Sequence, residues 1–176
     1  MSYRNRARAL AVAMTVAGLL NAAAAAQNLP AVRSLSDTAG ERIYLLRPDG
    51  VDVVDARTRR AVTRVVLPGW TWAGEPYSCL PDIAFAPEGD VLVTSNVLPV
   101  VWRIQRHSLA VREHRLAVEQ DAGRDVGFTR LRWSANEGAY VATTDLGELW
   151  EIDRQLTRAR KLSGIQPSAQ RLACEG

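Results

Sequence analysis

The sequence predicts an all-β chain made of three four-stranded antiparallel sheets. Three observations support this fold class. Similar segments recur 48 residues apart, beginning at Ile43, Val91 and Ala139. The segments are short, rich in β-branched and aromatic residues, and bounded by Gly, Pro, Asp or Asn. After residue 30, no long stretch combines helical periodicity with capping residues, so we expect almost no helix.

Each repeat contains a hairpin of two apolar strands joined by a turn, at residues 43–55, 91–105 and 139–153. In the first hairpin, Asp49-Gly50 is a two-residue turn signal because both residues tolerate positive φ. Apolar and polar residues roughly alternate along Val51–Asp55, which is the period of a half-buried strand. The hairpins therefore provide the two middle strands of each sheet.

A further strand precedes and follows each hairpin. Phe85–Gly89 and Trp133–Glu137 are apolar strands that run into turns, 48 residues apart. The strands predicted after the hairpins are Ala61–Leu67, Val111–Val118 and Arg158–Leu162. Each repeat is thus predicted to be four strands connected by short turns.

Four antiparallel strands in 40–50 residues is the pattern of a β-propeller blade. We place the blades at about residues 31–67, 81–118 and 128–165, with a C-terminal tail at 166–176. Propellers close with four to eight blades, so three blades predict an incomplete, open propeller. Its unpaired edges would be covered by a protein partner or by self-association that completes the propeller. A β-sandwich or an irregular stack of open sheets is the structural alternative.

The repeats also resemble a known family. The segments RIYLLRPDGVDVVDARTRRAVTRVVLPG and DIAFAPEGDVLVTSN are similar to YVTN-type repeats. These repeats occur in the propeller family that includes the quinoprotein amine dehydrogenase heavy chain. The resemblance covers most of residues 31–165 and implies a propeller fold. It assigns no catalytic residue, because the repeat motif is structural and propellers carry unrelated activities.

The N-terminus has the organisation of a secretory signal peptide. Three arginines in the first eight residues precede the apolar run Ala9–Leu20. Small residues at Ala24 and Ala26 then form an A-x-A cleavage site. We predict a signal peptide at residues 1–26, a mature domain at 27–176, and a periplasmic or secreted protein. The alternative is a retained membrane anchor, but Asn21 and the many alanines make a poor membrane span.

Net charge argues against a nucleic-acid partner. The full chain carries 22 basic and 19 acidic residues, a formal charge of +3. Residues 1–26 contain three of the basic residues and none of the acidic ones, so the mature chain has 22 − 3 = 19 basic residues against 19 acidic ones. No basic surface is left that would bind nucleic acid. No later apolar stretch is long enough for stable membrane insertion after cleavage.

The two cysteines, Cys79 and Cys174, are predicted to form a disulfide. An exported protein meets an oxidising compartment, where a pair of cysteines tends to be bonded. In a rigid propeller the two cysteines would lie too far apart for a disulfide. Both residues lie in connecting segments, however, and these could bring them together. An intermolecular disulfide and two free thiols are the alternatives.

The candidate binding surface is the long connection between the first and second blades. It carries Trp70, Trp72 and Tyr77, whereas Trp102 and Trp150 recur with the repeat and are expected to pack between sheets. Large aromatic side chains in a loop either cover a sheet or bind a partner. Both roles stay open for this loop.

We expect no catalytic residue, cofactor or metal. His107 and His114 lie on one predicted hairpin but lack a placed carboxylate ligand. The acidic residues near turns recur at equivalent positions and are expected to be turn or surface charges. The leading hypothesis is an exported, non-catalytic binding or scaffold protein. The alternative is an accessory subunit of a periplasmic quinoprotein-type dehydrogenase, or a propeller lactonase-like enzyme.

Overall fold

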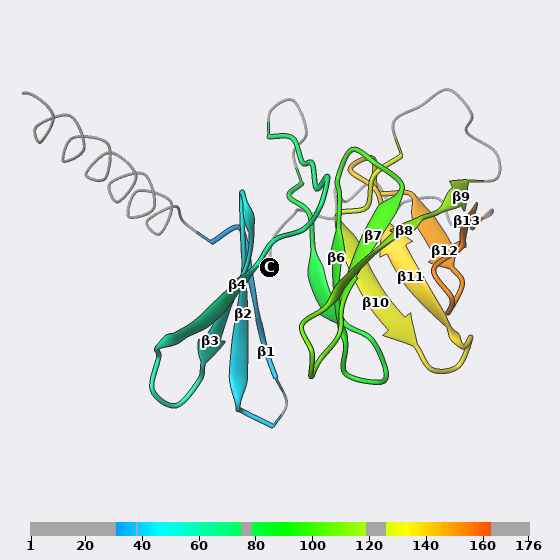
Figure 1. Cartoon of the computed structure of the whole chain (residues 1–176). Coiled ribbons are helices and arrows are strands. Elements are labelled where there is room, and N and C mark those ends of the chain that lie inside the picture. Colours follow the sequence, from blue (N-terminus) through cyan, green and yellow to red (C-terminus); the bar gives the residue numbers. More distant parts are fainter. Residues whose placement is uncertain (1–30, 38, 75–78, 119–125, 163–176) are drawn as a thin grey trace, which may run out of the picture. The chain divides into compact units, whose positions relative to one another are not determined.

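The computed structural model describes residues 31–37, 39–74, 79–118 and 126–162. These residues form thirteen β-strands and no helix (Figure 1). A helix long and apolar enough to cross a membrane is therefore absent from this described part. The all-β prediction is confirmed.

Twelve strands form three sheets, each of which follows the chain order from strand to strand. The first sheet contains β1 (Arg33–Ser36), β2 (Arg42–Arg47), β3 (Gly50–Asp55) and β4 (Ala61–Val65). The second contains β5 (Ile83–Phe85), β6 (Val91–Thr94), β7 (Val100–Ile104) and β8 (Val111–Arg115). The third contains β10 (Arg130–Ser134), β11 (Ala139–Thr143), β12 (Leu149–Ile152) and β13 (Arg158–Lys161). Sequential strands pair antiparallel, as in the blades of an incomplete propeller.

The third sheet differs from the prediction by a fifth strand. Strand β9 (Ala117–Val118) pairs in parallel with β13, and the Ala117 N–H donates to the Thr157 carbonyl at 2.9 Å. The chain that leaves the second blade thus continues onto the outer edge of the third. This pairing satisfies backbone groups that an uncovered edge would leave open. The third sheet is therefore mixed rather than purely antiparallel.

The first interface between sheets is an apolar layer between blades one and two. Tyr44, Leu46 and Val53 from the first sheet are at most 1% exposed. They belong to one cluster with Val93 and Trp102 of the second sheet. Burying side chains of this size is worth about 1.5–3 kcal/mol each, so this layer fixes how the two blades stack.

A second apolar layer lies between blades two and three. Leu92 and Val101 of the second sheet pack in one cluster with Tyr140 and Trp150 of the third. Phe128 joins them and meets the Trp150 ring edge-on, with ring centres 6.2 Å apart. The second blade is thus apolar on both faces, as expected for a blade with a neighbour on each side.

The outer faces of blades one and three carry ion pairs. On the first, Arg64 donates to Asp52 at 2.6 Å, and on the third, Arg160 and Glu151 are 3.1 Å apart. Within the described residues, no further blade packs against either face. A protein partner or second copy at these faces stays a prediction. The predicted signal peptide at residues 1–26 lies outside the described residues, so export also stays a prediction.

Candidate functional site

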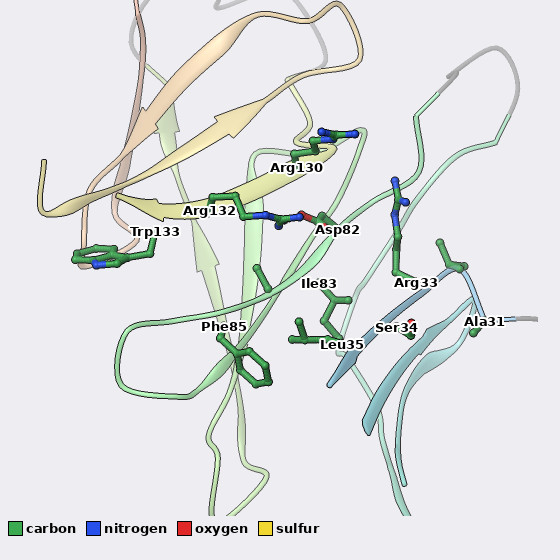
Figure 2. A pocket seen from close by; sticks show the side chains of 12 residues that line it. Ala31, Arg33, Ser34, Leu35, Asp82, Ile83, Phe85, Arg130, Arg132 and Trp133 are labelled. Carbon is green, nitrogen blue, oxygen red and sulfur yellow. The ribbon is translucent and has the colours of Figure 1, made fainter. Parts of the chain in front are cut away.

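A pocket of about 650 Å³ lies where the first strands of the three blades meet. We call it the axial pocket, and it is lined by two segments and three further residues: Ala31–Leu35, Asp82–Phe85, and Arg130, Arg132 and Trp133 (Figure 2). In each sheet the first strand, β1, β5 or β10, is the inner edge strand. The pocket therefore occupies the position in which propellers form their central channel.

Charged and apolar residues separate along the axial pocket. Arg33 and Arg130 are the first residues of β1 and β10, and Asp82 immediately precedes β5. Blades related by rotation about one axis start their inner strands at the same end. Figure 2 shows these three residues toward one end of the pocket, with Leu35 and Phe85 toward the other. The pocket thus has one ionic end and one apolar end.

Asp82 is a buried carboxylate that joins blade two to blade three. The residue is 5% exposed, and its Oδ2 accepts from the Leu131 N–H at 2.9 Å and from Arg132 at 2.7 Å. Its own N–H donates to the Thr94 hydroxyl at 2.8 Å. These bonds fix the position of the carboxylate and orient the Arg132 guanidinium.

Replacing Asp82 by alanine is expected to lower the free energy of unfolding by about 2–3 kcal/mol, because the buried Leu131 N–H loses its acceptor. Asp82→Asn is expected to cost only about 1 kcal/mol, because the amide oxygen still accepts from Leu131. The Arg132 side chain is 66% exposed, so loss of its ion pair adds little. Urea denaturation of both variants, with Glu151→Gln as a surface control, measures the difference. Equal losses for Asn and Ala would contradict this account.

Among the residues that line the pocket, Arg33 has a buried side-chain nitrogen, Nε, without a hydrogen-bond partner in the described chain. Its Nε is inaccessible to water and makes no hydrogen bond among the described residues. The backbone of Arg33 is fixed by pairing with Leu46. A buried N–H without an acceptor is unfavourable, so the Arg33 side chain would gain by turning this N–H toward a bound ligand.

Aromatic side chains are fixed at the edges of the pocket. Phe85 meets Tyr44 edge-on at 6.1 Å, and Trp133 meets Tyr140 at 4.9 Å. The Arg154 guanidinium lies 5.8 Å from the centre of the Trp133 ring. Burial raises the pKa of Tyr140 to about 12, so its hydroxyl stays neutral. These contacts hold the rings in place before any ligand enters.

The structure attaches the predicted Trp70–Trp72 loop to blade two. The Trp70 indole N–H donates to the Thr94 carbonyl at 3.0 Å, and Trp70 and Trp72 stack with ring centres 6.5 Å apart. Both rings are half-buried, and Asn96 holds the loop through two hydrogen bonds to Ala73. Packing therefore accounts for their burial, and binding by this loop stays a prediction. Tyr77 lies outside the described residues.

The two histidines do not share a site. His107 is exposed in the turn after β7, whereas His114 lies within β8 opposite Val101. Across the described ranges, no group of three His, Cys, Asp or Glu side chains could hold a metal ion. Near the first turn, Asp49 and Asp52 both accept hydrogen bonds from Arg64. These two acidic residues are engaged in turn and strand contacts.

His114 is expected to make stability fall as pH decreases from about 7 to 5. Burial, followed by repulsion from Arg112 and Arg103, lowers the pKa of His114 below its usual 6.5. The unfolded chain therefore binds the proton more readily, and the folded state loses stability as pH falls through 6.5 toward the folded pKa. The slope of unfolding free energy against pH should decrease in His114→Gln and persist in His107→Gln. An unchanged slope in His114→Gln would contradict this assignment.

Cys79 is buried at the entrance to blade two. Its N–H donates to Asp145 Oδ1 at 2.7 Å, and its carbonyl accepts from Asn96 at 3.0 Å. Cys174 lies outside the described residues, so the predicted Cys79–Cys174 disulfide stays a prediction. Non-reducing peptide mapping of exported protein should recover one linked peptide. Recovery of two alkylatable thiols would contradict it.

The charged residues of the axial pocket were not predicted from the sequence. One signal was present, because Asp82 and Arg130 are 48 residues apart and hold equivalent places in successive repeats. At this place the second repeat has a carboxylate and the third has a guanidinium, so the charge reverses at the start of an inner strand. The shared strand pattern does not require either charge, so the reversal points to another role.

Comparison with known proteins supports the fold. No protein-family model matches the chain, and no curated protein matches it, so the resemblance to YVTN-type repeats stays a prediction. Kuenenia stuttgartiensis hydrazine synthase matches with 14% identity and a TM-score of 0.54, over 77% of this chain and 35% of that one. Virginiamycin B lyase from Staphylococcus aureus matches with 13% identity and a TM-score of 0.51, over 73% and 39%.

A third solved structure, the dihydro-heme d1 dehydrogenase NirN, matches with 16% identity and a TM-score of 0.51. The match covers 78% of this chain and 28% of NirN. This chain thus spans between about a quarter and two fifths of the three structures it matches. At these identities the similarity shows the propeller-type fold alone.

Proposed function

We propose that this chain is an exported binding protein of the propeller type, which holds a ligand in the axial pocket without transforming it. The observation that carries the proposal is the axial pocket itself, about 650 Å³ lined by residues from all three blades. This volume lies within the range of small-molecule sites, roughly 300–1,000 Å³. Strands supply nine of its twelve lining residues, and the other three directly precede β1 or β5.

The state of Asp82 favours binding over catalysis. A general base must be available to take a proton from its substrate. Asp82 instead accepts two hydrogen bonds at one oxygen and pairs with Arg132. The other ionised groups of the lining are guanidinium groups, which stay protonated in proteins. These groups suit charge recognition more than proton transfer.

Native mass spectrometry of protein recovered from the exported fraction tests the proposal. We expect a co-purifying small molecule that is absent from Ser34→Trp, because Ser34 lines the pocket and its new ring would occupy that space. Ser36→Trp is the matched control, since Ser36 is also exposed on β1 but does not line the pocket. A bound mass that survives Ser34→Trp would contradict the proposal. A bound metal or redox cofactor would favour the enzyme-subunit alternative.

A further inference from the structure

We propose that the ligand of the axial pocket is an amphipathic organic anion, an apolar body that ends in a carboxylate or phosphate. The inference rests on the proposed function and adds the chemical class of the ligand. Arg33 would hold the anionic head at the ionic end, and Leu35 and Phe85 would contact the apolar body. This assignment follows from the charge of the lining, the state of Arg33 and the division of the pocket.

The lining is positively charged. It contains three guanidinium groups, Arg33, Arg130 and Arg132, and one carboxylate, Asp82. The Asp82–Arg132 pair, at 2.7 Å, balances one positive charge within the wall of the pocket. Arg33, which is not part of that pair, then carries positive charge into the ionic end, and this favours anions over cations.

The Nε–H of Arg33 has no acceptor in the described chain. This atom is buried, and β1 around it is held on one side by pairing with β2. Guanidinium groups bind carboxylates and phosphates through two parallel N–H donors. An oxyanion at this end could be bound by the guanidinium once the Arg33 side chain turns its Nε–H into the pocket, and that turn would also give the N–H an acceptor.

The apolar end limits the ligand further. Leu35 and Phe85 lie together on adjacent inner strands at the end away from the arginines (Figure 2). Phe85 cannot turn away freely, because its ring packs against Tyr44. Inorganic phosphate would fill only the ionic end and leave the apolar surface of Leu35 and Phe85 exposed to water. A ligand with both an anionic head and an apolar body would cover both ends.

Isothermal titration calorimetry with matched probes tests the ligand class. The probes are 2-naphthoate, 2-naphthyl phosphate, the neutral 2-naphthylmethanol and inorganic phosphate. We expect at least one naphthyl anion to bind about tenfold or more tightly than the alcohol and than inorganic phosphate, a difference of about 1.4 kcal/mol. The two naphthyl anions distinguish a carboxylate ligand from a phosphate ligand.

Arg33→Gln is expected to weaken binding of the naphthyl anion about tenfold or more and to leave binding of the alcohol unchanged. Arg112→Gln is the control, because Arg112 is exposed on β8 and does not line the pocket. Thermal unfolding of each variant confirms that it is folded. Ser34→Trp should abolish binding of the naphthyl anion by filling the pocket.

Equal affinity for the alcohol and the anions would overturn the anion assignment while leaving a ligand-binding pocket. The same holds if Arg33→Gln binds the anion as tightly as the unmodified chain. No measurable binding of any naphthyl probe would also overturn the assignment. If the chain binds the naphthyl anion and Arg33→Gln abolishes that binding, the anion assignment is supported. If, in addition, the small molecule that co-purifies with the protein is still bound to Ser34→Trp, only the proposed function is contradicted.

Discussion

Replacing Gly127 by alanine is expected to destabilise the protein by more than about 4 kcal/mol, a large part of the roughly 5–15 kcal/mol that stabilises a typical domain. An added Cβ would lie 1.9 Å from the Asn96 carbonyl carbon and 2.2 Å from its oxygen. It would also lie 2.2 Å from the Val97 nitrogen. All three are backbone atoms, so no rotation of a side chain relieves the overlap.

The chain segment opposite Gly127 is also fixed by hydrogen bonds. The Phe128 N–H donates to the Ser95 carbonyl at 2.6 Å. Ser95 Oγ in turn accepts from the Val97 N–H at 3.2 Å and the Leu98 N–H at 3.1 Å. Moving this segment to admit a methyl group would break bonds that connect blade two to the start of blade three.

Gly74→Ala is the matched control for Gly127→Ala. No atom lies within 4 Å of the Cβ that Gly74 would acquire, and its φ is not in the left-handed region. The substitution should be neutral or slightly stabilising, by up to about 1 kcal/mol, because alanine restricts the unfolded chain. Yield of folded protein, circular dichroism and urea denaturation compare the two variants. A well-folded Gly127→Ala protein within 1 kcal/mol of the parent would show that the close approach is wrong.

The sequence predicted the architecture because the strands carry local signals. The Asp49-Gly50 signal marks the first hairpin one residue late: Arg47 pairs with Gly50, so the turn itself is Pro48–Asp49. Gly50 opens β3 with a φ of +147°, which few other residues adopt. Its missing Cβ also accommodates the Val65 carbonyl, which would lie 2.5 Å from an added carbon. Turn residues and apolar strands of this kind are short-range features, which a sequence displays directly.

The third repeat shows where a fixed period fails. Trp102 and Trp150 are 48 residues apart, but Val93 pairs with Trp102 and Ala142 pairs with Trp150. Val93 and Ala142, the residues that pair with the two tryptophans, are thus 49 residues apart, because the hairpin connection in the third blade is one residue shorter than in the second. A one-residue shift exchanges the two faces of a strand. Tyr140, rather than Ala139, therefore faces blade two.

The axial pocket could not be predicted in the same way. Arg33, Asp82 and Arg132 come from three different blades, and none of them belongs to a motif that the sequence displays. What makes them a site is the stacking of the sheets, which depends on contacts between distant residues. By contrast, the tryptophans of the first linker drew attention because they cluster in the sequence, and the structure uses them in packing.

The two repeating tryptophans should also differ in how they respond to substitution. Both are at most 1% exposed, so Trp102→Ala and Trp150→Ala are each expected to cost about 3–5 kcal/mol through lost burial and a cavity. Their indole groups differ, however. The Trp102 N–H donates to the Pro68 carbonyl at 2.8 Å, whereas the buried Trp150 N–H has no partner in the described chain.

Phenylalanine should therefore be tolerated better at position 150 than at position 102. Trp102→Phe loses volume and a hydrogen bond, while Trp150→Phe loses volume but also removes an unsatisfied buried donor. We expect Trp150→Phe to be less destabilising by about 1 kcal/mol. Equilibrium urea denaturation of the four variants measures both comparisons, and the alanine pair controls for the effect of volume. A greater loss for Trp150→Phe than for Trp102→Phe would mean that the Trp150 N–H has an acceptor in solution, most simply a buried water molecule.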